Sequence, residues 1–287
     1  MLTPFTQSGD VNFDAHTRNV EKWNREPLAG YLLLGSNSET AYLSESEKLK
    51  LIELTVQSAA KERIILAGTG LESTIETITL TNKAARLGAH AALILTPNYY
   101  LGQMTDRALI AHFNAIADAS EIPILIYNVP KYTHLNISVD AVHTLSQHPN
   151  IIGMKDSKGD ITQLEHFMKI VPPEFNLIVG SASVLYDALS MGIRAGILAL
   201  SNFTPAACAQ IQTLFQCGEH EKARTVQARM IPVNRAVTDT YGVAGLKYAA
   251  TLLGYEGGEV RSPQLPLAND ESASLRQILI DGGLLAS

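Results

Sequence analysis

Lys155 and Tyr127 are the residues whose types and positions most directly suggest chemistry. Lys155 follows a short apolar run at residues 151–154, and Tyr127 closes another apolar run at residues 123–127. Burying an ammonium group is costly, so a lysine at the end of a buried strand favours the free amine. A free amine can form a Schiff base with a ketone, and a nearby tyrosine hydroxyl can carry protons. The competing interpretation is a lysine that extends into solvent beside a tyrosine that caps the core.

Small polar residues and further tyrosines follow other apolar runs. Residues 35–39 (GSNSE) form a turn whose hydroxyls and N–H groups could bind a carboxylate, although such turns are also common structural features. Tyr99 and Tyr100 follow a third run, and residues 180–182 (GSA) would let a ligand approach the backbone.

Motifs for metals and for common cofactors are missing from the sequence. The eight histidines form no HExxH pattern, and Cys208 and Cys217 match no metal or redox spacing. Residues 68–70 (GTG) lack the third glycine of a dinucleotide fingerprint. These absences argue against a zinc-dependent or dinucleotide-dependent mechanism, and a lysine Schiff base would need neither a metal nor a separate cofactor.

Seven apolar, β-rich runs must position these residues, and Leu2 and Thr3 could be the end of an eighth. The runs are residues 30–34, 63–67, 91–96, 123–127, 151–154, 177–179 and 196–200. Strands that are apolar throughout indicate a parallel sheet that is covered on both faces.

The segments between the runs predict helices. Ser44 with Glu47 and Ser73 with Glu76 have the spacing of capping boxes. Gly88 and Gly192 stand where helices are expected to end (a glycine that caps the C-terminus would close each one). Beyond residue 203 the strands stop, and the pattern predicts helices over 206–215, 219–233, 243–253 and 272–280.

The alternation of strands and helices predicts an α/β protein with a (β/α)8 TIM barrel and a C-terminal helical extension. The barrel would occupy residues 1–203 with a truncated first strand, and residues 204–287 would pack on it or serve in assembly. A doubly wound open sheet is the alternative.

Composition bounds the class of protein. The 287 residues are 46% hydrophobic and 17% charged, with a net charge of −6. This balance predicts a globular protein and argues against a nucleic-acid partner. No apolar run is long enough to predict a membrane span. We expect a cytoplasmic location, or a mitochondrial one if a transit peptide is missing.

Four motifs together resemble the dihydrodipicolinate synthase and N-acetylneuraminate lyase superfamily. They are GSNSE at 35–39, TPNYY at 96–100, YNVP at 127–130 and GMKDS at 153–157. Residues 145–157 look most like 4-hydroxy-2-oxoglutarate aldolase. The similarity covers essentially the whole chain.

The resemblance implies a class I pyruvate aldolase, a metal-independent carbon–carbon lyase of the oxo-acid-lyase or aldehyde-lyase type. Lys155 would form the Schiff base, and Tyr127 would shuttle protons through Ser36 and through Tyr99 of a neighbouring subunit. Ser36 and Asn37 would hold the carboxylate of the keto acid. The other expected substrate contacts are Ser157, Gly180 and Ser181. The family also implies a homo-oligomer, a dimer or a tetramer.

The expected reaction is cleavage of 4-hydroxy-2-oxoglutarate to pyruvate and glyoxylate. 4-Hydroxy-tetrahydrodipicolinate synthase and 2-keto-3-deoxy sugar acid aldolase are alternatives within the superfamily. The synthases carry an arginine at the position where this chain has Tyr132, next to Lys131. The lack of that arginine counts against the synthase reaction. A non-catalytic paralogue that binds keto acids is the alternative from another class.

Overall fold

The chain folds into two compact units, and the computed structural model describes residues 1–286. One unit contains Met1–Ile64 together with Leu198–Ser287, and the other, the central unit, contains Ile65–Ile197. The predicted division after residue 203 partitions the chain differently and stays a prediction.

Parallel strands in sequence order form the sheet of the central unit. Its strands are β2 (Ile64–Gly68, whose first residue belongs to the other unit), β3 (Ala91–Leu95), β4 (Ile124–Asn128), β5 (Ile151–Asp156), β6 (Asn176–Val179) and β7 (Ala195–Gly196). All residues of β4 are buried, as predicted for a strand covered on both faces. A doubly wound sheet reverses its strand order at one point, and β2 to β7 show no such reversal.

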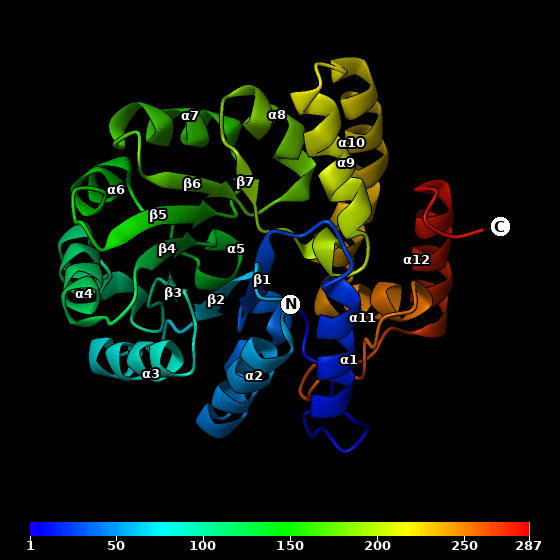
Figure 1. Cartoon of the computed structure of the whole chain (residues 1–287), viewed down its shortest axis with the longest axis horizontal. Coiled ribbons are helices and arrows are strands. Elements are labelled where there is room, and N and C mark those ends of the chain that lie inside the picture. Colours follow the sequence, from blue (N-terminus) through cyan, green and yellow to red (C-terminus); the bar gives the residue numbers. More distant parts are fainter. Residues whose placement is uncertain (287) are drawn as a thin grey trace. The chain divides into compact units, whose positions relative to one another are not determined.

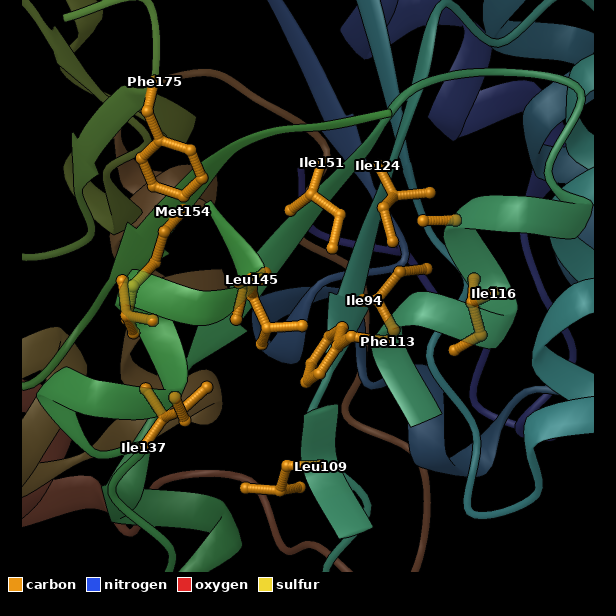
Figure 2. Close-up of a cluster of buried hydrophobic side chains, with 14 of the residues drawn as sticks. Ile94, Leu109, Phe113, Ile116, Ile124, Ile137, Leu145, Ile151, Met154 and Phe175 are labelled. Carbon is orange, nitrogen blue, oxygen red and sulfur yellow. The ribbon is translucent and has the colours of Figure 1, made fainter. Parts of the chain in front are cut away.

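Helices follow most strands of the central unit. They are α3 (Thr74–Arg86), η3 (Leu101–Gln103), α4 (Asp106–Ala119), α5 (Pro130–Thr133), α6 (Val139–Leu145), α7 (Ile161–Ile170), η4 (Ala182–Val184) and α8 (Leu185–Ser190). Figure 1 shows α3, α4, α6 and α7 on the outer side of β3 to β6. The apolar faces of these helices pack on the strands, as Phe113 and Leu145 do beside Ile94 and Ile151 (Figure 2).

The predicted helix-end residues all lie at helix ends, but not all of them form the predicted capping hydrogen bonds. Ser44 forms the predicted capping box with Glu47 at the start of α2 (Glu45–Ser58). Ser73 precedes α3, yet its side chain makes no capping hydrogen bond, so the second predicted box is wrong. Gly88 and Gly192 have φ of +101° and +100°, the left-handed conformation that glycine tolerates at a helix end.

The other unit holds both ends of the chain. Its elements are α1 (Phe13–Trp23), β1 (Gly30–Leu33), η1 (Ser36–Ser38), η2 (Thr40–Tyr42), α2, η5 (Ala199–Asn202), α9 (Pro205–Gln216), α10 (His220–Arg235), the π-helical turn η6 (Ala236–Thr240), α11 (Gly242–Leu252) and α12 (Asn269–Asp281). The four C-terminal helices predicted from the sequence are confirmed, and Figure 1 shows α9 and α10 side by side.

Leu2 and Thr3 are buried, but they do not form a named strand. The Met1 amino group donates to Leu32 O of β1 at 2.5 Å, and Leu2 N donates to Asn202 Oδ1 at 2.7 Å. The expected eighth strand is therefore present only as a short segment tied to the end of β1 and to η5. Seven strands are named among residues 1–286.

The expected strand at residues 196–200 ends early. β7 covers only Ala195–Gly196, and the chain then turns into η5. Asn202 supports this turn, because its Nδ2 donates to Ala199 O at 2.9 Å while its backbone O accepts from Trp23 Nε1. The α/β class and the C-terminal helices are thus confirmed, whereas a closed eight-stranded barrel stays a prediction.

Candidate active site

Lys155 and Tyr127 lie side by side at the carboxyl ends of neighbouring strands. The two residues are register partners of β4 and β5. Lys155 is 6% exposed, and its Nζ lies 4.4 Å from the centroid of the Tyr127 ring, which is itself buried. The interpretation of Lys155 as a side chain that extends into solvent is therefore wrong. A buried amine can form a Schiff base with a ketone, and a phenol beside it can transfer protons.

β5 continues one residue past Lys155, and Asp156 pairs with Asn128 on β4. Successive residues of a strand point to opposite faces, so Asn128 and Asp156 lie behind the Tyr127–Lys155 pair. Asn128 Nδ2 donates to Asp156 Oδ1 at 2.6 Å. Burial raises the pKa of Asp156, while the bond from Asn128 and the N–H groups of the following loop oppose that shift.

Ser157, Gly180 and Ser181 follow β5 and β6 in the same unit. Ser157 N donates to Asn128 O at 2.9 Å, and Gly180 N donates to Asp156 O at 2.7 Å. A Cβ on Gly180 would collide with the Ser157 side chain, so only glycine fits there. Ser181 Oγ accepts from Ser183 N at 3.3 Å and so caps the start of η4. The structure thus gathers these predicted contact residues at the carboxyl ends of β5, which carries Lys155, and of its neighbour β6.

Tyr99 lies in the same unit but faces outward. It is 75% exposed, and its ring meets Tyr100 edge-on at 5.0 Å between centroids. Its loop is held by Glu72, whose Oε2 accepts from the N–H groups of Asn98 and Tyr99 at 2.9 Å each. The backbone of Tyr99 is therefore fixed while its side chain is presented to the surroundings.

Ser36 and Asn37 belong to the other unit, where they form η1 directly after β1. Glu39 ends this turn in a left-handed conformation with φ of +54°, and its carboxylate is buried. Lys247 Nζ forms an ion pair with Glu39 Oε1 at 2.5 Å. The motif predicted the turn, but nothing in the sequence marked its buried ion pair with α11.

Sequence reasoning also missed Thr96, Asn128 and Asp156 as individual site residues. All three stand inside the motifs quoted above, and Asn128 and Asp156 directly follow Tyr127 and Lys155. Thr96 is buried after β3, and its Oγ1 has no hydrogen-bond partner within residues 1–286. The signal that could have found them is their place one residue after a strand or a catalytic candidate.

Neither a metal-binding cluster nor a membrane-spanning helix is present within residues 1–286. Over residues 1–286, no group of three or more His, Cys, Asp or Glu side chains is arranged to hold a metal ion. None of the helices in that part of the chain is both long and apolar enough to cross a membrane.

Comparisons with known proteins place this site in a family of enzymes. Residues 1–281 match the family model for the dihydrodipicolinate synthetase family. The 4-hydroxy-tetrahydrodipicolinate synthase of Acidiphilium cryptum is 33% identical over 286 residues, which is 100% of this chain and 97% of the relative.

Solved structures agree over nearly the whole chain. Dihydrodipicolinate synthase from Bacillus anthracis has a TM-score of 0.93 at 28% identity, covering 98% of this chain and 95% of that one. A chloride-inhibited dihydrodipicolinate synthase from Acinetobacter baumannii, complexed with pyruvate, has a TM-score of 0.91 at 28% identity, covering 99% and 97%.

The fold and the site define a lyase-type α/β enzyme with a lysine at the end of a parallel strand. The chain belongs to the dihydrodipicolinate synthetase family.

Proposed function

We propose that this protein is a class I pyruvate-dependent lyase in which Lys155 forms the Schiff base. The burial of the Lys155 amine against the Tyr127 ring is the observation that carries the proposal. A relative solved with pyruvate supports pyruvate as the keto acid.

The chemistry follows from the amine. Lys155 Nζ attacks C2 of pyruvate, the carbonyl oxygen leaves as water, and a protonated imine remains. The imine accepts the electron pair released when a proton leaves C3, which gives an enamine. The enamine carbon can then attack an aldehyde, and the reverse path cleaves a carbon–carbon bond. We assign the proton transfers to Tyr127, relayed through Ser36 and Tyr99, and carboxylate binding to Ser36 and Asn37.

For the aldehyde partner, the names of the relatives favour the 4-hydroxy-tetrahydrodipicolinate synthase reaction, in which the acceptor is aspartate semialdehyde. This assignment takes the place of the 4-hydroxy-2-oxoglutarate aldolase reaction that the sequence predicted, because the relatives named above are synthases.

One observation keeps 4-hydroxy-2-oxoglutarate cleavage as a second candidate. Tyr132 stands where the synthases carry an arginine for the distal carboxylate of aspartate semialdehyde. It is half-exposed in α5, and Lys131 Nζ lies 5.7 Å from its ring centroid. A phenol cannot form the bidentate pair that a guanidinium forms with a carboxylate.

Reductive trapping tests the Schiff base. Borohydride added with pyruvate should reduce the imine and leave on Lys155 the mass of pyruvate less one oxygen atom. The matched control is Lys247, a second buried lysine that also lies against an aromatic ring, and it should stay unmodified in the same digest. Peptide mass spectrometry that finds Lys155 unmodified at saturating pyruvate would eliminate the proposal.

A substrate panel separates the candidate reactions. Pyruvate should be consumed with aspartate semialdehyde if the synthase assignment is correct, and with glyoxylate if the second candidate is correct. Consumption with aldoses would indicate a 2-keto-3-deoxy sugar acid aldolase. Trapping at Lys155 without turnover of any partner would instead indicate a non-catalytic paralogue that binds keto acids.

The predicted assembly and metal independence complete the proposal. Because the Tyr99 side chain is exposed, a neighbouring subunit could receive it, and we expect a homodimer or homotetramer by light scattering. We also expect turnover to be unchanged after dialysis against a chelator.

A further inference from the structure

Two side-chain pairs lie back to back across β4 and β5. Tyr127 and Lys155 are register partners and contact each other on one face of the sheet. Asn128 and Asp156 are the next register partners and are hydrogen-bonded on the opposite face. Both pairs are attached to the carboxyl ends of β4 and β5. A displacement of one pair therefore also displaces the other.

The rear pair belongs to a buried polar network. Asn128 Oδ1 accepts from Ile137 N at 3.2 Å, and Asn128 Nδ2 also donates to Asn136 Oδ1 at 2.9 Å. The side-chain amides of Asn136 and Gln163 bond reciprocally at 2.9 and 3.1 Å. Gln163 lies on α7, so the network joins β4, the segment before α6, β5 and α7.

The backbone N–H groups of the loop after β5 act on the carboxylate of Asp156. The N–H groups of Lys158 and Gly159 favour its ionised form, and Gly159 has φ of +73°, a conformation that suits glycine. Lys158 Nζ donates to Gln163 Oε1 at 2.8 Å and forms an ion pair with Asp160 Oδ2 at 3.0 Å. Asp156 Oδ1 accepts from Asn128 Nδ2 and, at 3.4 Å, from Gln163 Nε2, whereas Oδ2 has no hydrogen-bond partner within residues 1–286. The two bonds to Oδ1 tie this end of β5 to β4 and to α7.

We propose that Asn128 and Asp156 are positioning residues, which hold the ends of β4 and β5 so that the Lys155 amine stays against Tyr127. This inference rests on the proposed Schiff-base function. Neither residue touches the keto acid; they act through the backbone of their neighbours. A productive geometry must be held to within about 0.5 Å, which backbone hydrogen bonds at a strand end do not secure alone.

Exchange of the two side chains tests the proposal. Asn128→Asp places two carboxylates where the 2.6 Å hydrogen bond now lies, so repulsion should part the strand ends. Asp156→Asn removes the accepting carboxylate without adding charge. The double variant Asn128→Asp/Asp156→Asn restores one amide and one carboxylate in exchanged positions. The readout is the first-order rate of borohydride trapping at Lys155 with saturating pyruvate.

We expect trapping to slow by about 10- to 100-fold in Asn128→Asp and the double variant to recover at least about 10-fold, since a misplacement near 1 Å costs about that much. Asn150 offers a matched control at the amino ends of the same two strands. Its backbone O accepts from Ile124 N, and its Nδ2 donates to Ala117 O at 2.8 Å. Asn150→Asp should lower the melting temperature without changing the trapping rate.

The outcomes are distinct. If the wild type is not trapped at Lys155, the proposed function itself fails. If the wild type is trapped and Asn128→Asp reacts at the same rate, only the positioning role is overturned. Should Asn128→Asp not fold, Asp156→Asn decides: trapping as fast as wild type overturns the role, and slow trapping in a folded protein supports it.

Discussion

The two units each bury one lysine against an aromatic ring, and the two lysines differ in their counter-charges. Lys155 of the central unit lies 4.4 Å from the Tyr127 centroid, and Lys247 of the other unit lies 4.4 Å from the Phe5 centroid. Lys247 is 2% exposed and has Glu39 Oε1 at 2.5 Å and Glu259 O at 2.5 Å. Within residues 1–286, no ion pair reaches Lys155.

Lys247 belongs to a buried ion pair whose role is structural. Glu39 also accepts from Arg261 N at 2.9 Å, and the Arg261 guanidinium lies 4.3 Å from the Phe5 centroid. Burial lowers the pKa of Lys247 to about 8, and Glu39 opposes that shift. Burial beside an aromatic ring therefore does not by itself identify a catalytic lysine; the difference lies in whether a carboxylate already satisfies the amine.

The same substitution at both lysines gives the sharpest contrast. Lys155→Met removes the proposed nucleophile while keeping a side chain of similar length. We expect turnover to fall by at least about 10⁴-fold, as happens when a covalent catalyst is deleted. Steady-state kinetics with the preferred aldehyde measures the loss, and circular dichroism should show an unchanged fold. Turnover within about tenfold of wild type would remove Lys155 from the mechanism.

Tyr127→Phe tests the other half of the proposed catalytic pair. The ring that contacts Lys155 is kept, and only the hydroxyl is lost. We expect the turnover number to fall by about 10²- to 10⁴-fold if the hydroxyl transfers protons. Phe5→Leu is the comparison in the other unit, because it changes a ring beside a lysine without touching the proposed site. A Tyr127→Phe variant that turns over normally would leave the ring a purely structural role.

Lys247→Met should lower the free energy of unfolding. In the folded variant, the rate of borohydride trapping at Lys155 should be unchanged. It strands the Glu39 carboxylate in the interior, which typically costs about 3–5 kcal/mol of unfolding free energy. Urea denaturation measures the loss. The double variant Lys247→Met/Glu39→Gln should recover part of it because no buried charge remains. An undiminished unfolding free energy in Lys247→Met would show that the pair contributes nothing.

Acid should destabilise both units through one buried histidine in each. Burial lowers the pKa of His16 and of His112 to about 4 from the usual 6.5. Between pH 6.5 and 4 the unfolded chain therefore binds protons that the folded chain does not, so stability falls as the pH is lowered through this window. His16→Gln should flatten part of this dependence, each pKa unit corresponding to about 1.4 kcal/mol. Melting temperatures of the wild type and of His16→Gln, measured between pH 7 and 4, give the dependence of stability on pH for each protein. The same dependence in both would show that His16 does not contribute.

Several features of the site could be predicted because they depend on local pattern. The apolar runs located the strands to within about two residues at most ends, and parallel strands bring their carboxyl ends to one edge. That rule alone joined Tyr127 to Lys155. The run at residues 196–200 misled, since apolar content does not reveal that Asn202 bonds back to the chain and forms η5.

By itself, the sequence determined the order of strands and helices, the place of Lys155 at a strand end and the family resemblance. Tertiary structure alone decided which lysine carries a counter-ion and which residues lie behind the Tyr127–Lys155 pair. The physical reason is that strand and helix signals repeat over a few residues, whereas the Glu39–Lys247 ion pair and the Asn128–Asp156 bond join residues that only the folded chain brings together.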